Sequence, residues 1–173
     1  MTFNDHEKKA LLKGWRRWRG VIEFLAPECA HEIAAIAFRE STWDANCEPR
    51  YERAWHERYI RGDSENAKYW LRKVTATGYQ EQWFATSWGL MQILGLTAME
   101  RGYGGDPEQI QIPEISLLYG TMHFKWLWDK YTSVYDAIAA YNAGSPRRYD
   151  ATTYVNQDYV DYVLAGLDAL RAA

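Results

Sequence analysis

Ile33–Ser41 has the sequence IAAIAFRES, which places one carboxylic acid at the end of an apolar helical stripe. Positions i, i+3, i+4 and i+7 of a single helix face are occupied by Ile33, Ile36, Ala37 and Glu40. Ser41 and Thr42 follow, and both compete for the backbone hydrogen bonds that would continue a helix. The stretch predicts a helix ending near Glu40, with this side chain turned toward the interior or a cleft wall.

A glutamate in such a place is partly desolvated, which raises the pKa of its carboxyl group and keeps part of it protonated near neutral pH. A protonated carboxylic acid in an apolar cleft can act as a general acid. An ordinary surface glutamate at a helix end has the same local pattern, so Glu40 has two interpretations that only the rest of the chain can separate.

The composition indicates a folded chain rich in aromatic residues. Of 173 residues, 47% are apolar and 16% aromatic, with nine Trp and thirteen Tyr. This excludes a disordered chain, and the length predicts a single domain over residues 1–173. The aromatic content suits a groove that stacks on sugar rings or bases. Twenty basic and twenty-three acidic residues give a net charge of -3, so we expect no nucleic-acid partner.

Neither the cysteines nor the histidines indicate a metal site. Cys29 and Cys47 form no CxxC motif or Cys/His cluster, so we expect free thiols, although an oxidising compartment could pair them. The four histidines lack ligand spacing, and we expect no metal and no cofactor. The first residues, MTFNDHEKK, are polar, which predicts a chain without a signal peptide. No run approaches the roughly eighteen apolar residues of a membrane span.

Residues 5–25 are predicted to form an amphipathic helix. Its apolar stripe consists of Leu11, Trp15, Trp18, Ile22 and Leu25. The other face carries Lys8, Lys9, Lys13, Arg16, Arg17 and Arg19. A basic helix with tryptophans at residues 8–19 could make transient contact with an anionic membrane or with nucleic acid. A solvated face on a packed helix explains the same pattern and is favoured.

The remaining pattern predicts a mainly α protein. Further helices are expected at residues 54–60, 64–74, 97–103, 113–131, 134–142 and 156–173. Residues 113–131 carry two apolar stripes, one on Leu117 and Phe124 and one on Leu118 and Met122, which predicts a central helix. A small β-hairpin fits within residues 75–95. The long irregular stretches 43–62 and 75–87 are typical of binding loops.

Three short motifs occur in a fixed order. Glu40-Ser41 closes the apolar helix, Gly89–Ile93 reads GLMQI, and Ala140–Gly144 reads AYNAG. In this order the motifs resemble those of the soluble lytic transglycosylase family, relatives of goose-type lysozyme within the lysozyme-like superfamily. The resemblance covers residues 33–162, about three quarters of the chain, and leaves residues 1–25 outside. It implies a mainly α, lysozyme-like single domain with a substrate cleft.

The resemblance also implies the roles of individual residues. Glu40 takes the place of the single catalytic acid, while Gln92, Tyr141 and Asn142 take those of cleft-lining residues that position the substrate. The other residues at substrate-binding motif positions are Ser41, Met91 and Tyr159, the last with Tyr154 and Tyr162 as competitors. The implied partner is the peptidoglycan glycan strand of alternating N-acetylmuramic acid and N-acetylglucosamine.

A lytic transglycosylase can work with one carboxylate. Glu40 would protonate the glycosidic oxygen and then deprotonate the muramic acid C6 hydroxyl, which closes a 1,6-anhydro ring at high effective concentration. The segment after Glu40 departs from the family pattern because it carries Asp44, Glu48 and Glu52. A second carboxylate, Glu52 first among them, would instead make a hydrolysing lysozyme if it lay about 6.5–9.5 Å away, the separation of an inverting pair.

Two other functions remain open at the level of sequence. One is a non-catalytic glycan-binding or virion assembly module, which the presence of Glu40 disfavours. The other is a membrane- or nucleic-acid-active protein that works through the basic helix, which the net charge disfavours. Small size and the polar start predict a monomeric phage or prophage endolysin, or a virion-associated enzyme, made in the cytoplasm and acting at the bacterial cell wall.

Overall fold

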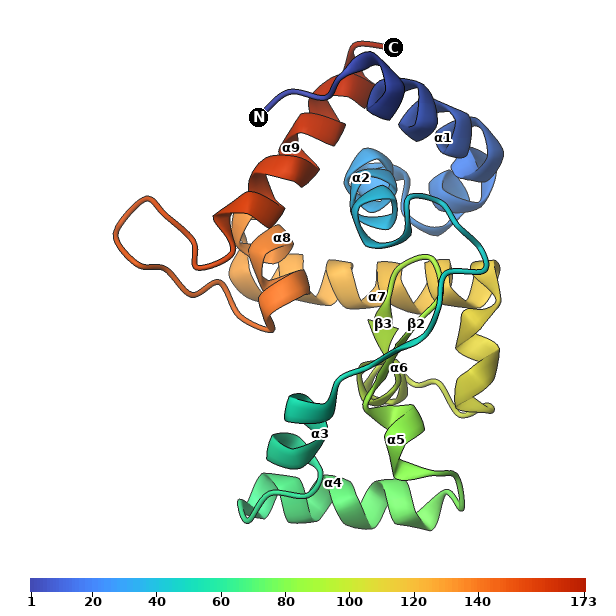
Figure 1. Cartoon of the computed structure of the whole chain (residues 1–173), viewed down its shortest axis with the longest axis vertical. Coiled ribbons are helices and arrows are strands. Elements are labelled where there is room, and N and C mark those ends of the chain that lie inside the picture. Colours follow the sequence, from blue (N-terminus) through green and yellow to red (C-terminus); the bar gives the residue numbers. More distant parts are fainter.

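The computed structural model describes residues 1–173 and shows a helical body above a smaller lobe (Figure 1). The body contains α1 (Asp5–Leu25), α2 (Ala30–Ser41), α7 (Pro113–Tyr131), α8 (Val134–Ala143) and α9 (Gln157–Arg171). Helix α2 lies among α1, α7 and α9, and its residues Ile33–Phe38 are all buried. The apolar stretch that opened the sequence is therefore the centre of the main core.

The smaller lobe is built from short elements between α2 and α7. Four helices, α3 (Arg53–Tyr59), α4 (Glu65–Ala76), α5 (Glu81–Phe84) and α6 (Gly95–Glu100), surround strands β1 (Arg50–Tyr51), β2 (Thr86–Trp88) and β3 (Ile93–Leu94). The antiparallel sheet has the order β1-β2-β3, with Arg50 opposite Ser87 and Ser87 opposite Leu94. Two 3-10 turns, η1 (Pro27–Cys29) and η2 (Pro107–Gln111), precede α2 and α7.

The helix ends follow from capping chemistry. Asn4 accepts from the Glu7 amide and Glu7 accepts from the Asn4 amide, which is a complete capping box at the start of α1. Ser64 and Ser133 cap α4 and α8 through their hydroxyl groups. Gly144 ends α8 with φ 74, a conformation that glycine adopts without steric cost. These signals are local, so the predicted helices are found at nearly the expected bounds.

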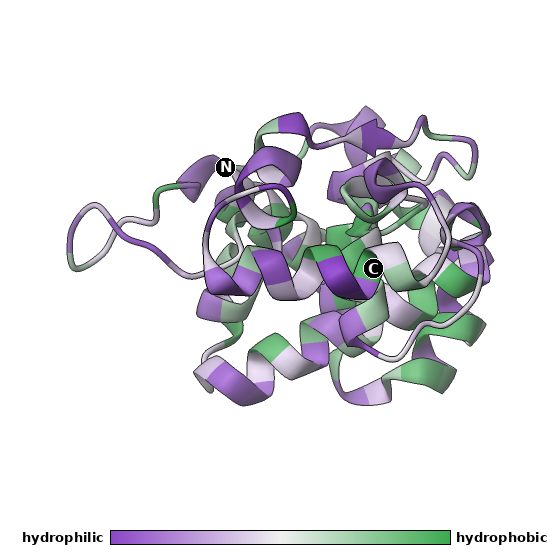
Figure 2. Cartoon of the chain, turned by 90° about the horizontal axis from the view of Figure 1, so that it is seen from below, coloured by the Kyte–Doolittle hydropathy of each residue, from purple (hydrophilic) through white to green (hydrophobic).

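The mainly α class with a small hairpin is confirmed, and one expectation needs correction. Leu118 and Met122 were expected to form a second buried stripe, but they expose 36% and 41% of their surface because that side of α7 is only partly covered. Trp15 and Trp18 of α1 are buried against the core, as the favoured interpretation of a packed helix expects, while the cations Lys8, Lys9, Lys13, Arg16, Arg17 and Arg19 are exposed. Bands of hydrophilic and hydrophobic residues alternate along the helices, as amphipathic packing requires (Figure 2).

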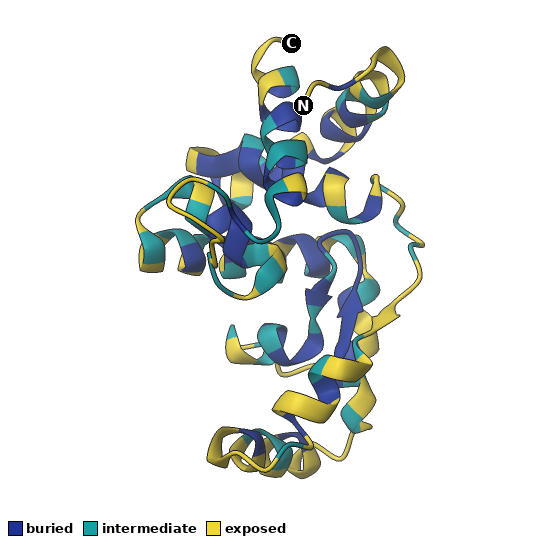
Figure 3. Cartoon of the chain, turned by 60° about the vertical axis from the view of Figure 1, so that its left-hand side comes forward, coloured by how far each residue is buried: buried dark blue, intermediate teal, exposed yellow.

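The burial pattern separates a dry centre from an exposed periphery. Buried residues concentrate in α2, in strands β2 and β3 and on the inner faces of α7 and α8, while β1, α4 and the segment between α8 and α9 are largely exposed (Figure 3). Both cysteines are free thiols; Cys29 is buried and Cys47 partly buried. None of the helices combines the length and the apolar character that crossing a membrane requires.

Candidate active site

Glu40 lies on the last turn of α2 and reaches the wall of a cavity of about 300 Å³. Thr42 ends the helix in the left-handed conformation, and its amide donates to the Phe38 carbonyl. The Tyr159 hydroxyl donates to Glu40 Oε1 over 2.7 Å. Burial raises the pKa of the Glu40 carboxyl, against smaller lowering effects from the Tyr159 hydrogen bond, Arg50 and Arg39. Glu40 therefore stays protonated to a higher pH than an exposed glutamate.

The second motif forms the turn between β2 and β3 and leads into the cavity. Gly89 has φ 66, and a Cβ atom there would lie 2.7 Å from Ser116 Oγ. That hydroxyl accepts from the Met91 amide at 2.9 Å and donates to the Trp88 carbonyl at 3.3 Å. These contacts anchor the turn on α7. Gln92, with φ 43, lines the cavity, and its Nε2 donates to the Gly89 carbonyl at 3.2 Å.

The third motif closes α8 and connects to the second motif. The Tyr141 hydroxyl donates to the Met91 carbonyl at 2.9 Å, which ties α8 to the hairpin turn. Burial, and then the neighbouring Glu40, raise the pKa of Tyr141 well above its ordinary value. The next residue, Asn142, lines the cavity and accepts from Asn156 Nδ2 at 3.0 Å. The motif thus supplies Tyr141, which joins α8 to the hairpin turn, and Asn142, which faces the cavity.

The segment after α2 brings a second acid into the same cavity. Glu52 lies at the start of α3 and accepts from Arg50 Nε at 2.6 Å and from Ser87 Oγ at 3.4 Å. Glu52 also contributes to the raised pKa of Glu40, as a nearby negative charge must. The candidate second carboxylate therefore shares the cavity with Glu40 but is held in an ion pair.

Comparison with known protein families finds a Transglycosylase SLT domain at residues 29–159. The chain belongs to this family. No curated protein and no solved structure gives a significant match. Membership of the transglycosylase SLT family implies peptidoglycan as the substrate and the cell wall as the place of action.

The motif residues of the SLT domain fall into two groups, those that line the cavity and those that do not. Glu40, Gln92, Tyr141 and Asn142 line the cavity. The other three, Ser41, Met91 and Tyr159, do not line it: Ser41 Oγ donates to the Ala37 carbonyl at 3.0 Å, Met91 is fully buried, and Tyr159 is 5% exposed. Direct contact of these three with substrate stays a prediction from the sequence. Met91 and Tyr159 hold cavity residues from behind, through hydrogen bonds to Tyr141 and Glu40.

Several cavity residues of the SLT domain were missed by sequence reasoning. Trp55 and Tyr59 lie one helical turn apart on α3, with ring centroids 5.0 Å apart, and both line the cavity. The prediction of a binding loop at residues 43–62 was the signal that could have found them. His123 on α7 also lines the cavity, and burial lowers its pKa to about 3, so it is neutral at physiological pH.

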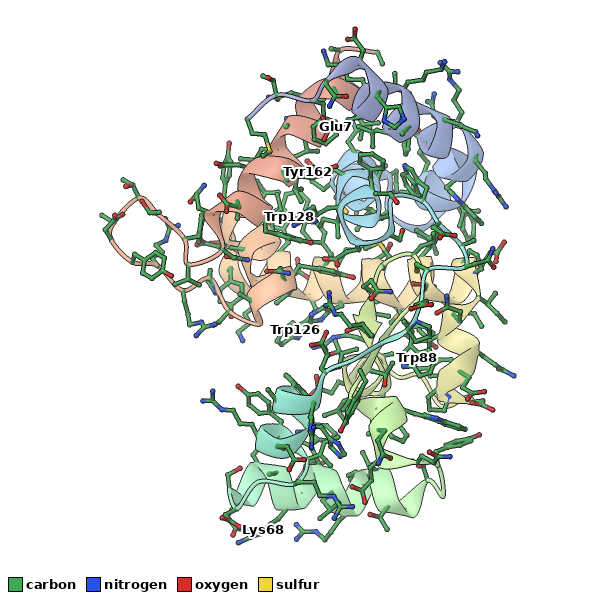
Figure 4. All side chains as sticks on the ribbon, viewed as in Figure 1. Glu7, Lys68, Trp88, Trp126, Trp128 and Tyr162 are labelled. Carbon is green, nitrogen blue, oxygen red and sulfur yellow. The ribbon has the colours of Figure 1, made fainter.

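Around Glu40 the supporting side chains are aromatic and cationic. The Arg39 guanidinium lies 5.6 Å from the Tyr159 ring centroid and 5.0 Å from that of Tyr162. Tyr162 lies on the side of α9 that faces α2, and Trp128 belongs to α7 (Figure 4). No group of three His, Cys, Asp or Glu side chains is arranged to hold a metal ion. The site offers acid–base chemistry and polar positioning groups.

Proposed function

We propose that the SLT domain cleaves the β-1,4 bond between N-acetylmuramic acid and N-acetylglucosamine, with Glu40 as acid and then base. The observation that carries this proposal is the raised pKa of Glu40 in the cavity, caused chiefly by burial. A carboxylic acid whose pKa is raised keeps its proton to a higher pH and can give it to a leaving oxygen. The Tyr159 hydrogen bond holds the carboxyl group in one orientation.

The reaction balances without water. Glu40 protonates the glycosidic oxygen as the bond from muramic acid C1 to that oxygen breaks. The Glu40 carboxylate then takes the proton of the C6 hydroxyl of the same sugar, while the C6 oxygen forms a bond to C1. The nucleophile belongs to the substrate, so its effective concentration is high. The product is a 1,6-anhydro muramic acid end, and Glu40 is again protonated.

The polar and aromatic lining suits a neutral amino sugar. Gln92 and Asn142 can bind acetamido and hydroxyl groups without adding a charge beside the acid. Trp55 and Tyr59 offer flat apolar faces for sugar rings. We assign substrate positioning to these four residues, and we assign to Ser41, Met91, Tyr141 and Tyr159 the support of the groups that touch substrate.

A hydrolysing lysozyme is the second candidate, and the position of Glu52 favours it. Its carboxylate lines the same cavity as Glu40 and could activate a water molecule. This carboxylate already forms an ion pair with Arg50 at 2.6 Å. We favour the transglycosylase because Glu52 already has two partners in the folded chain, Arg50 and Ser87.

Mass spectrometry of the products released from purified peptidoglycan separates these two candidates. Transglycosylation gives anhydro ends about 18 Da lighter than the reducing ends of hydrolysis, because the intramolecular capture consumes no water. We expect anhydro products from the wild type and from Glu52→Gln. Reducing ends that disappear in Glu52→Gln would establish the lysozyme mechanism instead.

The role of Glu40 has its own test in the clearing of a peptidoglycan suspension. Glu40→Gln keeps the shape of the side chain but has no proton to give, so we expect a loss of at least about 10²-fold in rate. Full activity in this variant would end the assignment. Binding to peptidoglycan without any cleavage by the wild type would support the non-catalytic glycan-binding module. The phage or prophage origin and the monomeric state stay predictions from the sequence.

A further inference from the structure

Two exposed features lie outside the active site and have no role in it. The first is the solvent face of α1, where Phe24 exposes 86% of its surface. The second is the outer side of α7, where Leu118, Met122 and Trp126 expose 36%, 41% and 41%. Large apolar side chains that gather on a surface indicate an interaction site.

The charge of the chain is unevenly distributed. Helix α1 carries six cations and three acids, a net charge of +3, so the rest of the chain carries -6. Positions 9, 13, 17, 20 and 24 recur at helical steps of three and four, which puts Lys9, Lys13 and Arg17 on the same side as Phe24. All four side chains are exposed. This face therefore combines cations with one protruding aromatic ring.

The apolar surface continues from α1 onto α7. Leu25 follows Phe24 and lines a groove of about 450 Å³ together with Leu118, Met122 and Trp126. The labelled Trp126 lies on the side of α7 that faces the smaller lobe (Figure 4). Just beyond α1, Glu28 of η1 pairs with Lys125 of α7 at 2.5 Å, which links the end of α1 to α7. The groove and the cationic face of α1 are therefore neighbours.

The cationic face of α1 is separate from the active site. Leu25 precedes the first residue of α2, whereas Glu40 lies on its last turn. A twelve-residue helix is about 18 Å long, so the end of α1 and Glu40 lie at opposite ends of α2. The groove comes closer to the cavity, because Trp126 stacks on the cavity residue His123 with ring centroids 6.0 Å apart. The Transglycosylase SLT domain match begins at residue 29, so α1 lies outside it. A partner on α1 can therefore leave the cavity open.

We propose that α1 and the adjoining groove dock the protein on the surface of an anionic phospholipid membrane. The cations would meet the lipid phosphates, and Phe24 would insert among the acyl chains near the headgroups. A soluble polyanion would use the cations but not Phe24, and a second copy of the chain would use the apolar groove but meet the same positive charge. An anionic membrane interface uses both. The proposal does not rest on the catalytic assignment of Glu40.

Sedimentation of the full chain with vesicles tests this docking. We expect binding to vesicles of phosphatidylglycerol and phosphatidylcholine, little binding to phosphatidylcholine alone, and weaker binding in salt. Lys13→Glu with Arg17→Glu should lower the partition coefficient at least about tenfold, and Phe24→Ser about tenfold. The matched control is Lys68→Glu with Arg72→Glu, two exposed cations at the same spacing on α4, at the far end of the molecule (Figure 4). It should bind like the wild type.

Three outcomes would overturn the proposal. Equal binding to neutral and anionic vesicles, or no effect of the Lys13 and Arg17 changes, would exclude an electrostatic membrane contact. Binding of a soluble phosphate polymer that is unaffected by Phe24→Ser would assign the face to a polyanion. A dimer in light scattering that Phe24→Ser and Met122→Ser dissociate would assign the groove to a second copy. Clearing of peptidoglycan by the same variants shows separately whether the active site is intact.

Discussion

At the scale of the residue, the burial of Glu40 has a structural cost and supports the chemical role proposed for it. The helix that carries it is buried over Ile33–Phe38, and the acid stands where this buried face meets the cavity. A carboxylate in such a place loses water contacts that a neutral acid does not need. The same desolvation that makes the ionised form unfavourable favours the protonated form, which the proposed role of Glu40 as an acid requires.

Glu40→Gln should change the pH dependence of stability. A carboxyl group whose folded pKa is raised stabilises the fold below its unfolded pKa of about 4.3 and loses that contribution as pH rises through the folded value. Glutamine does not titrate, so we expect the melting temperature of the variant, relative to the wild type, to rise between about pH 4 and pH 8. Thermal melts followed by circular dichroism at both pH values measure this difference.

The control for that experiment is Glu57→Gln, which removes an exposed carboxylate of α3. An exposed carboxylate keeps its hydration in the folded state, so this variant measures the effect of the same substitution away from the buried site. A Glu40→Gln difference that stays constant with pH, or that falls as pH rises, would contradict a raised pKa.

Sequence reasoning placed cavity residues better than it assigned their contacts. Glu40, Gln92 and Asn142 were predicted from motifs and do line the cavity. Ser41 was expected beside the acid, but its hydroxyl returns to the helix backbone at Ala37, a bond that any buried helical serine can make. Motif position does not determine side-chain direction, so Met91 could not be recognised as fully buried.

At the scale of the element, the helices were predictable and the strands only partly so. Helical periodicity and capping residues lie within one segment, which is why α1, α7 and α8 have nearly the predicted bounds. Strand β1 has two residues and is defined by its pairing of Arg50 with Ser87, far along the chain. No local pattern marks such a strand. The exposed side of α7 was mispredicted because periodicity shows a face, not what covers it.

Two glycines test how closely these elements pack. A Cβ atom at Gly120 on α7 would lie 2.5 Å from Met91 Cβ, whereas one at Gly20 on α1 would meet nothing within 4 Å. We expect Gly120→Ala to destabilise the fold by about 1–3 kcal/mol through overpacking. Gly20→Ala should instead stabilise it by up to about 1 kcal/mol, because alanine favours helix. Urea unfolding of both variants measures the two free energies.

The Gly120 contact also reaches the active site. Met91 carries the carbonyl that accepts from Tyr141, and the next residue is Gln92. A displaced Met91 should therefore lower the rate of peptidoglycan clearing in Gly120→Ala below that of Gly20→Ala under conditions where both are folded. Equal rates with equal stabilities would show that the hairpin turn tolerates the extra methyl group.

At the scale of the whole molecule, the cavity exists only because distant segments converge. Glu40 and Tyr159 are 119 positions apart and share a hydrogen bond, while Arg50, Trp55 and His123 come from three further elements. Family motifs could indicate which segments meet, since each motif marks one wall. They could not indicate the aromatic wall of α3, because Trp55 and Tyr59 belong to no motif.

Soluble peptidoglycan fragments should stabilise the folded protein. Glu40→Gln is suited to this experiment because it should bind without turnover. A ligand at one hundred times its dissociation constant contributes about 2.7 kcal/mol, which corresponds to a rise in melting temperature of roughly 5–10 °C for a chain of this size. We expect the additional change Trp55→Ala to reduce the rise, as loss of a stacking surface requires.

Oligosaccharides of glucose alone provide the comparison, because they lack the acetamido groups that Gln92 and Asn142 are proposed to bind. They should leave the melting temperature nearly unchanged. A rise of the same size with glucose oligomers would mean that the cavity does not distinguish amino sugars. A rise that Trp55→Ala leaves intact would remove α3 from the binding surface.

The backbone conformation at Gln92 has a consequence for which residues evolution can place at this position. Its φ of 43 is a left-handed conformation that costs a residue other than glycine about 1–2 kcal/mol. A population selected only for thermal robustness would be drawn toward glycine at this site, while one selected for growth through wall cleavage would retain the amide. At position 92, selection for fold stability and selection for wall cleavage would therefore favour different residues.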